Sequence, residues 1–154
     1  MDHKLNGQKG IYDIVNKEKL DVVSNPISEA HGLPNECYNS KEYTKIERKK
    51  LFEDKWVVIG VASSVPNPGD AKPFDLLGIP LIILRNKKKQ IKVYHNVCSH
   101  RGYKILQKKC SIKNVLRCPY HSWSYNLDGT LVATPNLGGM DKHEAEGFDK
   151  SSSG

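Results

Sequence analysis

From residue 56 onward the chain consists of short apolar runs, rich in Val, Ile and Leu, with turn-forming sequences between them. Such runs, bounded by Gly, Pro, Asn and Asp, are typical of β-strands. The sequences NPGD and RNKKKQ supply turns, and Asp128-Gly129 is a hairpin signal. Because the runs follow one another with no helical pattern between them, they predict an antiparallel all-β domain. The predicted strands cover residues 56–62, 80–86, 91–97, 114–118 and 122–133.

The segment TKIERKKLFEDKW, residues 44–56, is predicted to form one short amphipathic helix before the strands. Thr44 precedes Glu47 by three residues, which is the spacing of a capping box. Residues 1–39 show no sustained period and contain scattered Gly, Pro and Asn. We therefore expect them to form an arm that lies on the domain surface or on another subunit.

The composition is that of a soluble globular protein, with 154 residues, 38% of them apolar and 27% charged. No run approaches the roughly 18 apolar residues of a membrane span, and MDHKLNGQKG lacks the apolar centre of a secretory signal. These features predict a cytoplasmic protein without a membrane partner. In that compartment, cysteines near histidines favour metal binding or redox chemistry over disulfides.

The net charge of +7 is unevenly distributed. Residues 80–125 contain eleven Lys or Arg and no Asp or Glu, which leaves 13 basic and 17 acidic residues elsewhere. The sequence offers no reading helix, stacking sheet or paired zinc ligands, so we do not expect a nucleic-acid partner. The basic segment is either a solvated lysine surface or a docking surface, and the charge alone does not choose between them.

Two short Cys/His clusters stand out within this basic segment. Cys98-x-His100 is followed, after seventeen residues, by Cys118-x-x-His121, and each cluster comes directly after a predicted strand. A structural zinc site usually takes paired cysteines from one arm and paired histidines from the other. One thiolate and one imidazole from each loop suit a two-metal cluster instead, with both cysteines on one iron and both histidines on the second. That is the ligand set of a Rieske [2Fe–2S] centre. The alternative is two buried thiols and two hydrogen-bonded histidines.

The motifs CSHRG and CPYHSWSY, followed by DGTLVATPNLGG, resemble the Rieske family and, within it, the α subunits of Rieske non-haem iron oxygenases. The similarity extends upstream through GLPNECYNSKEYTKIERKKLFEDKWVVIG. It implies a Rieske-type antiparallel β-sandwich whose cluster-binding subdomain consists of two loops, preceded by one short helix. The corresponding division is an arm over 1–39, the Rieske domain over 40–145 and a linker beginning at 146–154.

The resemblance also suggests roles for four residues beside the cluster. Arg101 could anchor a carboxylate, and Gly102 permits a tight turn. Rieske proteins of respiratory complexes carry a disulfide where this chain has Tyr103 and Tyr120, and a serine that donates to a cluster sulfide where it has Trp123. Trp123 either tunes the cluster or is ordinary core. Fewer donors to sulfur stabilise the reduced cluster less, so we expect a low reduction potential for the class.

An oxygenase of this family also needs a mononuclear Fe(II) held by two histidines and a carboxylate. The sequence contains no Asp-x-x-His-x₃₋₄-His run, so we expect that iron only in a domain absent from this chain, which alone should not be catalytic. One hypothesis is the electron-transfer domain of an oxygenase, cut out or encoded by a truncated gene. Its partners would be an acidic reductase or ferredoxin and a catalytic domain, often of a neighbouring subunit. The alternative is a stand-alone Rieske ferredoxin.

Overall fold

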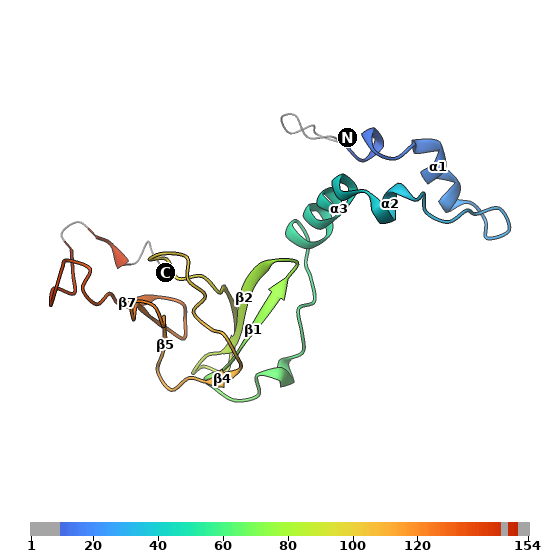
Figure 1. Ribbon diagram of the computed structural model, residues 1–154. Helices are drawn as coiled ribbons and strands as arrows, with labels where there is room; N and C mark the ends of the chain where they lie inside the picture. Colours follow the sequence, from blue (N-terminus) through green and yellow to red (C-terminus); the bar gives the residue numbers. More distant parts are fainter. Residues whose placement is uncertain (1–9, 146–147, 151–154) are drawn as a thin grey trace. The chain divides into compact units, whose positions relative to one another are not determined.

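The computed structural model describes residues 10–145 and 148–150. The chain divides into two compact units, Met1–Val58 and Ile59–Gly154 (Figure 1). Of the predicted linker over 146–154, all but 148–150 lies outside the described residues, as does the start of the predicted arm. The three-part division of the chain stays a prediction.

The described part of the first unit is helical, with α1 at Lys17–Asp21, α2 at Glu36–Asn39 and α3 at Lys41–Arg48. Helix α3 continues into a π-helical turn, Lys49–Glu53, so the predicted amphipathic helix is present. Its start was predicted wrongly: Ser40 caps the helix by accepting a hydrogen bond from the Tyr43 N–H at 3.2 Å, while the Thr44 hydroxyl donates to the Ser40 carbonyl. Helices α1 and α2 are too short to leave a periodic pattern in the sequence.

The second unit contains two antiparallel sheets, which confirms the all-β prediction. The first has the strand order β3-β2-β1-β4, and the second has the order β5-β6-β7. The strands are β1 (Asp70–Leu76), β2 (Ile79–Arg85), β3 (Ile91–His95), β4 (Cys110–Ser111), β5 (Val115–Arg117), β6 (Ser124–Asn126) and β7 (Leu131–Ala133).

Four of the five predicted strand regions contain strands, and the hairpin predicted at Asp128-Gly129 joins β6 to β7. The strand predicted over 56–62 is wrong, because residues 56–61 pair with no sheet and Ala62–Ser64 forms a 3₁₀ turn. A run of β-forming residues becomes a strand only where another edge accepts its hydrogen bonds. Strand β1 was not predicted, since Pro73 and two charged residues interrupt its apolar pattern.

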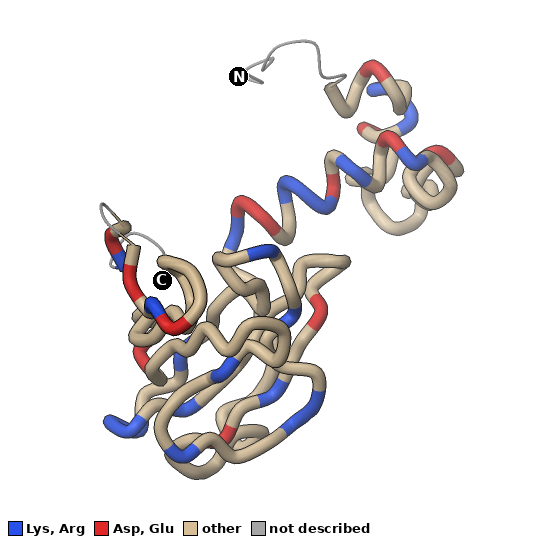
Figure 2. The backbone as a smooth tube through the Cα atoms, turned by 60° about the vertical axis from the view of Figure 1, so that its left-hand side comes forward, with Lys and Arg blue, Asp and Glu red and all other residues tan. Residues whose placement is uncertain are grey.

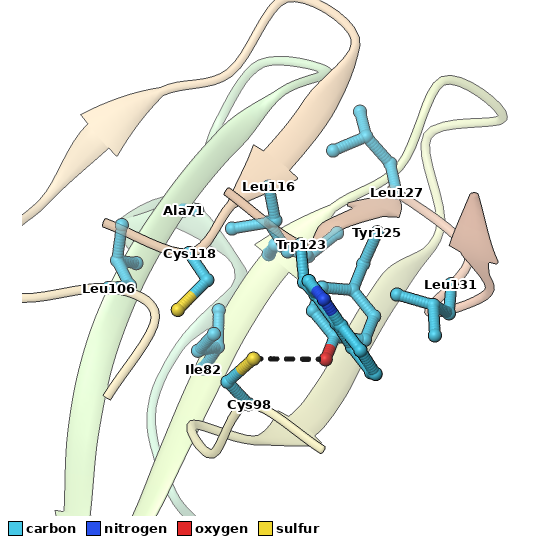
Figure 3. Packing of buried hydrophobic residues seen from close by; sticks show 11 residues of the cluster. Ala71, Ile82, Cys98, Leu106, Leu116, Cys118, Trp123, Tyr125, Leu127 and Leu131 are labelled. Carbon is cyan, nitrogen blue, oxygen red and sulfur yellow. Dashed lines mark hydrogen bonds between the residues drawn. The ribbon is translucent and has the colours of Figure 1, made fainter. Parts of the chain in front are cut away.

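The core lies between the two sheets (Figure 3). Three consecutive residues of β2, Ile82, Ile83 and Leu84, are buried, so the centre of this strand is covered on both faces. Leu116, Tyr125 and Leu131 of the second sheet belong to the same cluster. Both cysteines of the Cys/His motifs are also members of it, so the motifs are attached to the best-packed part of the unit.

Both sheets carry a Cys/His loop at one end and a tight turn at the other. Strand β3 runs from the 86–90 turn toward Cys98, and β5 runs toward Cys118. The far turns are linked by the buried Asn86 side chain, whose Nδ2 donates to Asp128 Oδ1 at 2.8 Å. Strand β4 pairs with Ala71, opposite Leu84, at the far end of the first sheet. The topology therefore brings the two Cys/His loops to one end of the unit.

Candidate metal centre

The two Cys/His loops close with the same backbone pattern. In the first, the Cys98 N–H donates to the Tyr103 carbonyl at 2.8 Å, and the Gly102 N–H donates to the Cys98 carbonyl at 2.8 Å. Gly102 has a φ of 69°, which favours glycine even though a Cβ there would meet nothing within 4 Å. The second loop repeats both bonds, at 2.8 and 3.0 Å, and the positive φ, here 63°, with Cys118, Ser122 and Trp123 in the corresponding places.

The histidines occupy positions that differ by one residue in these two matching loops. His100 is the second residue after Cys98, and His121 is the third after Cys118. Their rings are nevertheless adjacent, with centroids 4.6 Å apart and planes at 75°. The loops thus place two imidazoles side by side, one from each loop.

The two cysteine side chains are buried, with exposed fractions of 1% for Cys98 and 2% for Cys118, and both are free thiols. Burial raises the pKa of Cys118, and the neighbouring Cys98 thiol raises it further. The backbone N–H groups of Tyr120 and His121 donate to the Cys118 sulfur and lower this pKa in part. Figure 3 shows both sulfur atoms at the edge of the core. Two thiols that would repel each other as thiolates are thus packed together beside N–H donors, which suits a bound cation.

Tyr125 of β6 places its hydroxyl at the first cysteine. The hydroxyl oxygen lies 3.3 Å from Cys98 Sγ, 2.8 Å from Ser99 Oγ and 3.0 Å from the Ser99 nitrogen, which donates to it (dashed line in Figure 3 for the first). The sequence analysis missed this contact. The position of the Tyr125 hydroxyl depends on how the two sheets pack, which no local sequence pattern indicates.

The imidazoles have surroundings that fit metal ligation. His121 Nδ1 is buried and makes no hydrogen bond, which costs free energy unless another group binds it. The His100 ring stacks on Trp123, with centroids 4.6 Å apart and planes at 12°. Burial lowers the pKa of His100, and His121 and Arg101 lower it further, so the neutral ring that binds metals is favoured.

Comparison with known proteins shows the family to which the chain belongs. Residues 55–144 match the family model described as the Rieske [2Fe-2S] domain. The chain belongs to the Rieske [2Fe–2S] family.

Relatives of this Rieske chain include oxygenase subunits. It is 33% identical over 138 residues to the carnitine monooxygenase oxygenase subunit of Acinetobacter baumannii, a match that covers 88% of the chain and 36% of that subunit. Among solved structures, it is similar to the quaternary ammonium Rieske monooxygenase CntA in complex with γ-butyrobetaine (TM-score 0.70, 32% identity, 78% of this chain and 33% of that one). It is also similar to naphthalene 1,2-dioxygenase from a Rhodococcus species (TM-score 0.67, 28% identity, 79% and 26%). The chain thus spans about a third of these relatives.

A Rieske cluster needs only two protein ligands on each iron, because the sulfides supply the rest. Within residues 10–145 and 148–150, no three His, Cys, Asp or Glu side chains are grouped as a site for one metal ion. The paired thiols and the paired imidazoles are therefore suited to separate irons of one cluster. The ligand set Cys98, His100, Cys118 and His121 stays a prediction that this geometry fits.

The four other residues predicted to bind the cofactor have different surroundings. Trp123 is buried and packs on His100. It also lies edge-on to the Phe148 ring, with the ring centroids 5.6 Å apart. Tyr120 is half-exposed and covers His121, with ring centroids 3.7 Å apart. Gly102 forms the turn described above, and Arg101 is exposed beside His100. Tyr103 and Tyr120 occupy the positions at which respiratory Rieske proteins carry a disulfide. Their ring centroids are 5.6 Å apart.

The buried side-chain amide of Asn96 fixes the segment that follows the first Cys/His loop. The Asn96 side chain donates to the Leu106 carbonyl at 2.7 Å and accepts from the Leu106 N–H at 2.8 Å. Both backbone groups are buried, and each would cost roughly 1–3 kcal/mol without a partner. Asn96 thus anchors the loop that contains His100, a role that the sequence pattern did not indicate.

Other cysteines and histidines of the chain have different surroundings. Cys110 is in β4 and Cys37 in α2, and both are free thiols. His95 is exposed on β3, and His143 Nδ1 accepts a hydrogen bond from the Asn136 N–H at 3.2 Å. Cys110 lies at the end of the first sheet that is away from the paired loops.

Basic residues are distributed along the strands and turns of the second unit (Figure 2). Lys104 directly follows Tyr103, which closes the first Cys/His loop. Burial raises the pKa of Cys110, and Lys108 is close enough to lower it in part. Lys109 directly precedes Cys110 of β4, which pairs with Ala71 at the end of the sheet away from the Cys/His loops.

Proposed function

We propose that this chain is the electron-transfer domain of a terminal oxygenase α subunit. The observation that supports this most strongly is the pairing of two buried thiols with two adjacent imidazoles at one end of the unit. The bound [2Fe–2S] cluster would supply one-electron redox chemistry between a reductase or ferredoxin and a mononuclear iron. That iron would serve oxygen-dependent hydroxylation or demethylation in another domain.

The chain's own residues would perform three tasks in this function. Cys98 and Cys118 would hold one iron in the dry interior, and His100 and His121 would hold the other near the surface. Trp123 and Tyr120 would fix the orientation of the two imidazoles through their ring contacts.

A hollow of about 470 Å³ borders both histidines, and its wall includes Arg117 and Asn136. We propose that the acceptor domain, that of a neighbouring subunit, docks there.

The electron donor is proposed to be an acidic protein, since residues 80–125 contain no acidic side chain. Lys104→Glu should slow reduction by a chemically reduced acidic [2Fe–2S] ferredoxin by roughly threefold to tenfold at low ionic strength, because charge steers the encounter. The matched variant Lys109→Glu, beside β4 at the far end, should have a smaller effect. Stopped-flow rates that are equal for the two variants, or flat with salt, would exclude docking beside Lys104.

The alternative function is a stand-alone Rieske-type ferredoxin. The first proposal is favoured because the similar proteins are oxygenases, among them a carnitine monooxygenase oxygenase subunit and the monooxygenase CntA. The genomic sequence that follows residue 154 tests it. An in-frame continuation with an Asp-x-x-His-x₃₋₄-His run supports an oxygenase, whereas a stop codon supports a carrier.

The substrate class of the proposed oxygenase is either a quaternary amine or an aromatic ring, because similar proteins include a carnitine monooxygenase subunit and a naphthalene dioxygenase. No helix among the described residues is long and apolar enough to cross a membrane. We propose a cytoplasmic location from the composition of the chain.

A further inference from the structure

We propose that Ser99 is a positioning residue that directs the Tyr125 hydroxyl proton toward the Cys98 sulfur. Ser99 would then raise the reduction potential of the cluster without touching it. The inference rests on the proposed ligation of the cluster by Cys98. The group concerned is the side-chain hydroxyl of Ser99, which is in contact with the Tyr125 hydroxyl.

The three groups form a compact arrangement around one oxygen atom. Tyr125 is 6% exposed, and its hydroxyl oxygen lies 2.8 Å from Ser99 Oγ and 3.3 Å from Cys98 Sγ. The Ser99 N–H also donates to this oxygen, at 3.0 Å. Ser99 follows Cys98 directly in the chain, so one residue presents both its backbone and its side chain to the same hydroxyl.

The number of protons and lone pairs fixes the direction of each bond. A tyrosine hydroxyl has one proton to donate and two lone pairs that accept. The Ser99 N–H can only donate, so it occupies one lone pair. A Cys98 thiolate that is bound to iron can only accept, so it takes the single Tyr125 proton. The Ser99 hydroxyl must therefore donate to the remaining lone pair.

This direction strengthens the bond to sulfur. A hydroxyl that accepts two hydrogen bonds is polarised and becomes a better donor, because chains of hydrogen bonds reinforce one another in a low-dielectric interior. Without the Ser99 hydroxyl, Tyr125 would accept only one bond and donate less strongly. Donors to cluster sulfur stabilise the reduced state, so loss of the Ser99 hydroxyl should lower the potential.

The second loop has no equivalent of this arrangement. Pro119 occupies the position that corresponds to Ser99, and proline has neither a hydroxyl nor an N–H. The Cys118 sulfur instead receives the backbone N–H groups of Tyr120 and His121. The relay through Tyr125 thus serves Cys98 specifically.

A double-mutant cycle on the cluster-loaded protein tests this role. The variants are Ser99→Ala, Tyr125→Phe and the double variant, and the readout is the midpoint potential from spectroelectrochemical titration. Alanine keeps the N–H, so Ser99→Ala removes only the hydroxyl, and Ser99→Gly provides a second such variant. We expect Ser99→Ala to shift the potential to more negative values, by less than Tyr125→Phe does. The double variant should match Tyr125→Phe, and Ser99→Thr should recover part of the shift.

Ser124→Ala is the matched control, because it also removes a serine hydroxyl. That hydroxyl donates to the Ser122 carbonyl at 2.9 Å instead of to Tyr125. Its potential should equal that of the unmodified protein. A Ser99→Ala shift that persists in full with Phe at 125 would overturn the relay, as would no shift or an equal shift in Ser124→Ala. A protein that binds no iron–sulfur cluster at all would instead overturn the proposed function.

Discussion

Replacing either Cys98 or Cys118 with alanine is expected to abolish cluster binding. Each thiol is buried and would supply half of the protein ligands of one iron, so no exposed group can take its place. Changes in outer partners already cost about 10–100-fold in metal affinity, and loss of a ligand should cost more. Iron and acid-labile sulfide analysis should show both contents falling by more than about tenfold.

The chain provides its own controls for this experiment. Cys37→Ala and Cys110→Ala remove free thiols that are outside the two Cys/His motifs, and both variants should keep the full iron and sulfide content. If Cys110→Ala loses the cluster while Cys98→Ala keeps it, the assignment of the thiolate ligands is incorrect.

The second large effect is expected for His121→Cys. His121 Nδ1 is buried without a hydrogen bond and is positioned to bind the outer iron. A thiolate in its place adds negative charge, which opposes reduction. The potential should fall by about 100 mV or more, toward the roughly −400 mV of plant-type clusters, and the visible and EPR spectra of the reduced protein should change.

His95→Cys is the matched control for this change, because His95 lies exposed on β3 outside the site. That variant should keep the spectrum and potential of the unmodified protein. Equal spectra for His121→Cys and the unmodified protein would mean that His121 does not bind the cluster.

Local patterns in the sequence were sufficient to predict the loops and most of the second unit. Short apolar runs bounded by turn sequences predicted β2 and β3, and the Asp128-Gly129 turn predicted the hairpin of β6 and β7. Each motif can be recognised from a few consecutive residues, because each loop closes through backbone hydrogen bonds to its own cysteine. The candidate ligands were therefore identifiable before any tertiary contact was known.

The features that sequence reasoning missed depend on contacts between distant segments. The run over 56–62 has strong β-propensity but lacks a pairing edge, whereas β1 has a weak pattern and gains its strand from β2. The Tyr125 hydroxyl reaches Cys98 only because the sheets pack face to face. The positions of the basic side chains in the fold could not be predicted either. Lys109, for example, is near Cys98 in the sequence but lies beside β4.

The Tyr125 contact also changes the argument for a low reduction potential. Trp123 still occupies the position of the serine that donates to sulfide in respiratory relatives, and no disulfide joins the loops. Tyr125 supplies one donor to sulfur that the sequence analysis did not count. A potential in the lower part of the Rieske range of about −150 to +300 mV stays our prediction, with Tyr125 raising it from a still lower value.

The central claim is that one iron is held by two cysteines and the other by two histidines. Mössbauer spectroscopy of the ⁵⁷Fe-loaded, reduced protein tests this directly, because it distinguishes irons with different ligands. We predict two inequivalent irons in equal amounts, with the added electron on the histidine-bound iron. Two irons with identical all-sulfur surroundings, or a single iron without sulfide, would contradict the account.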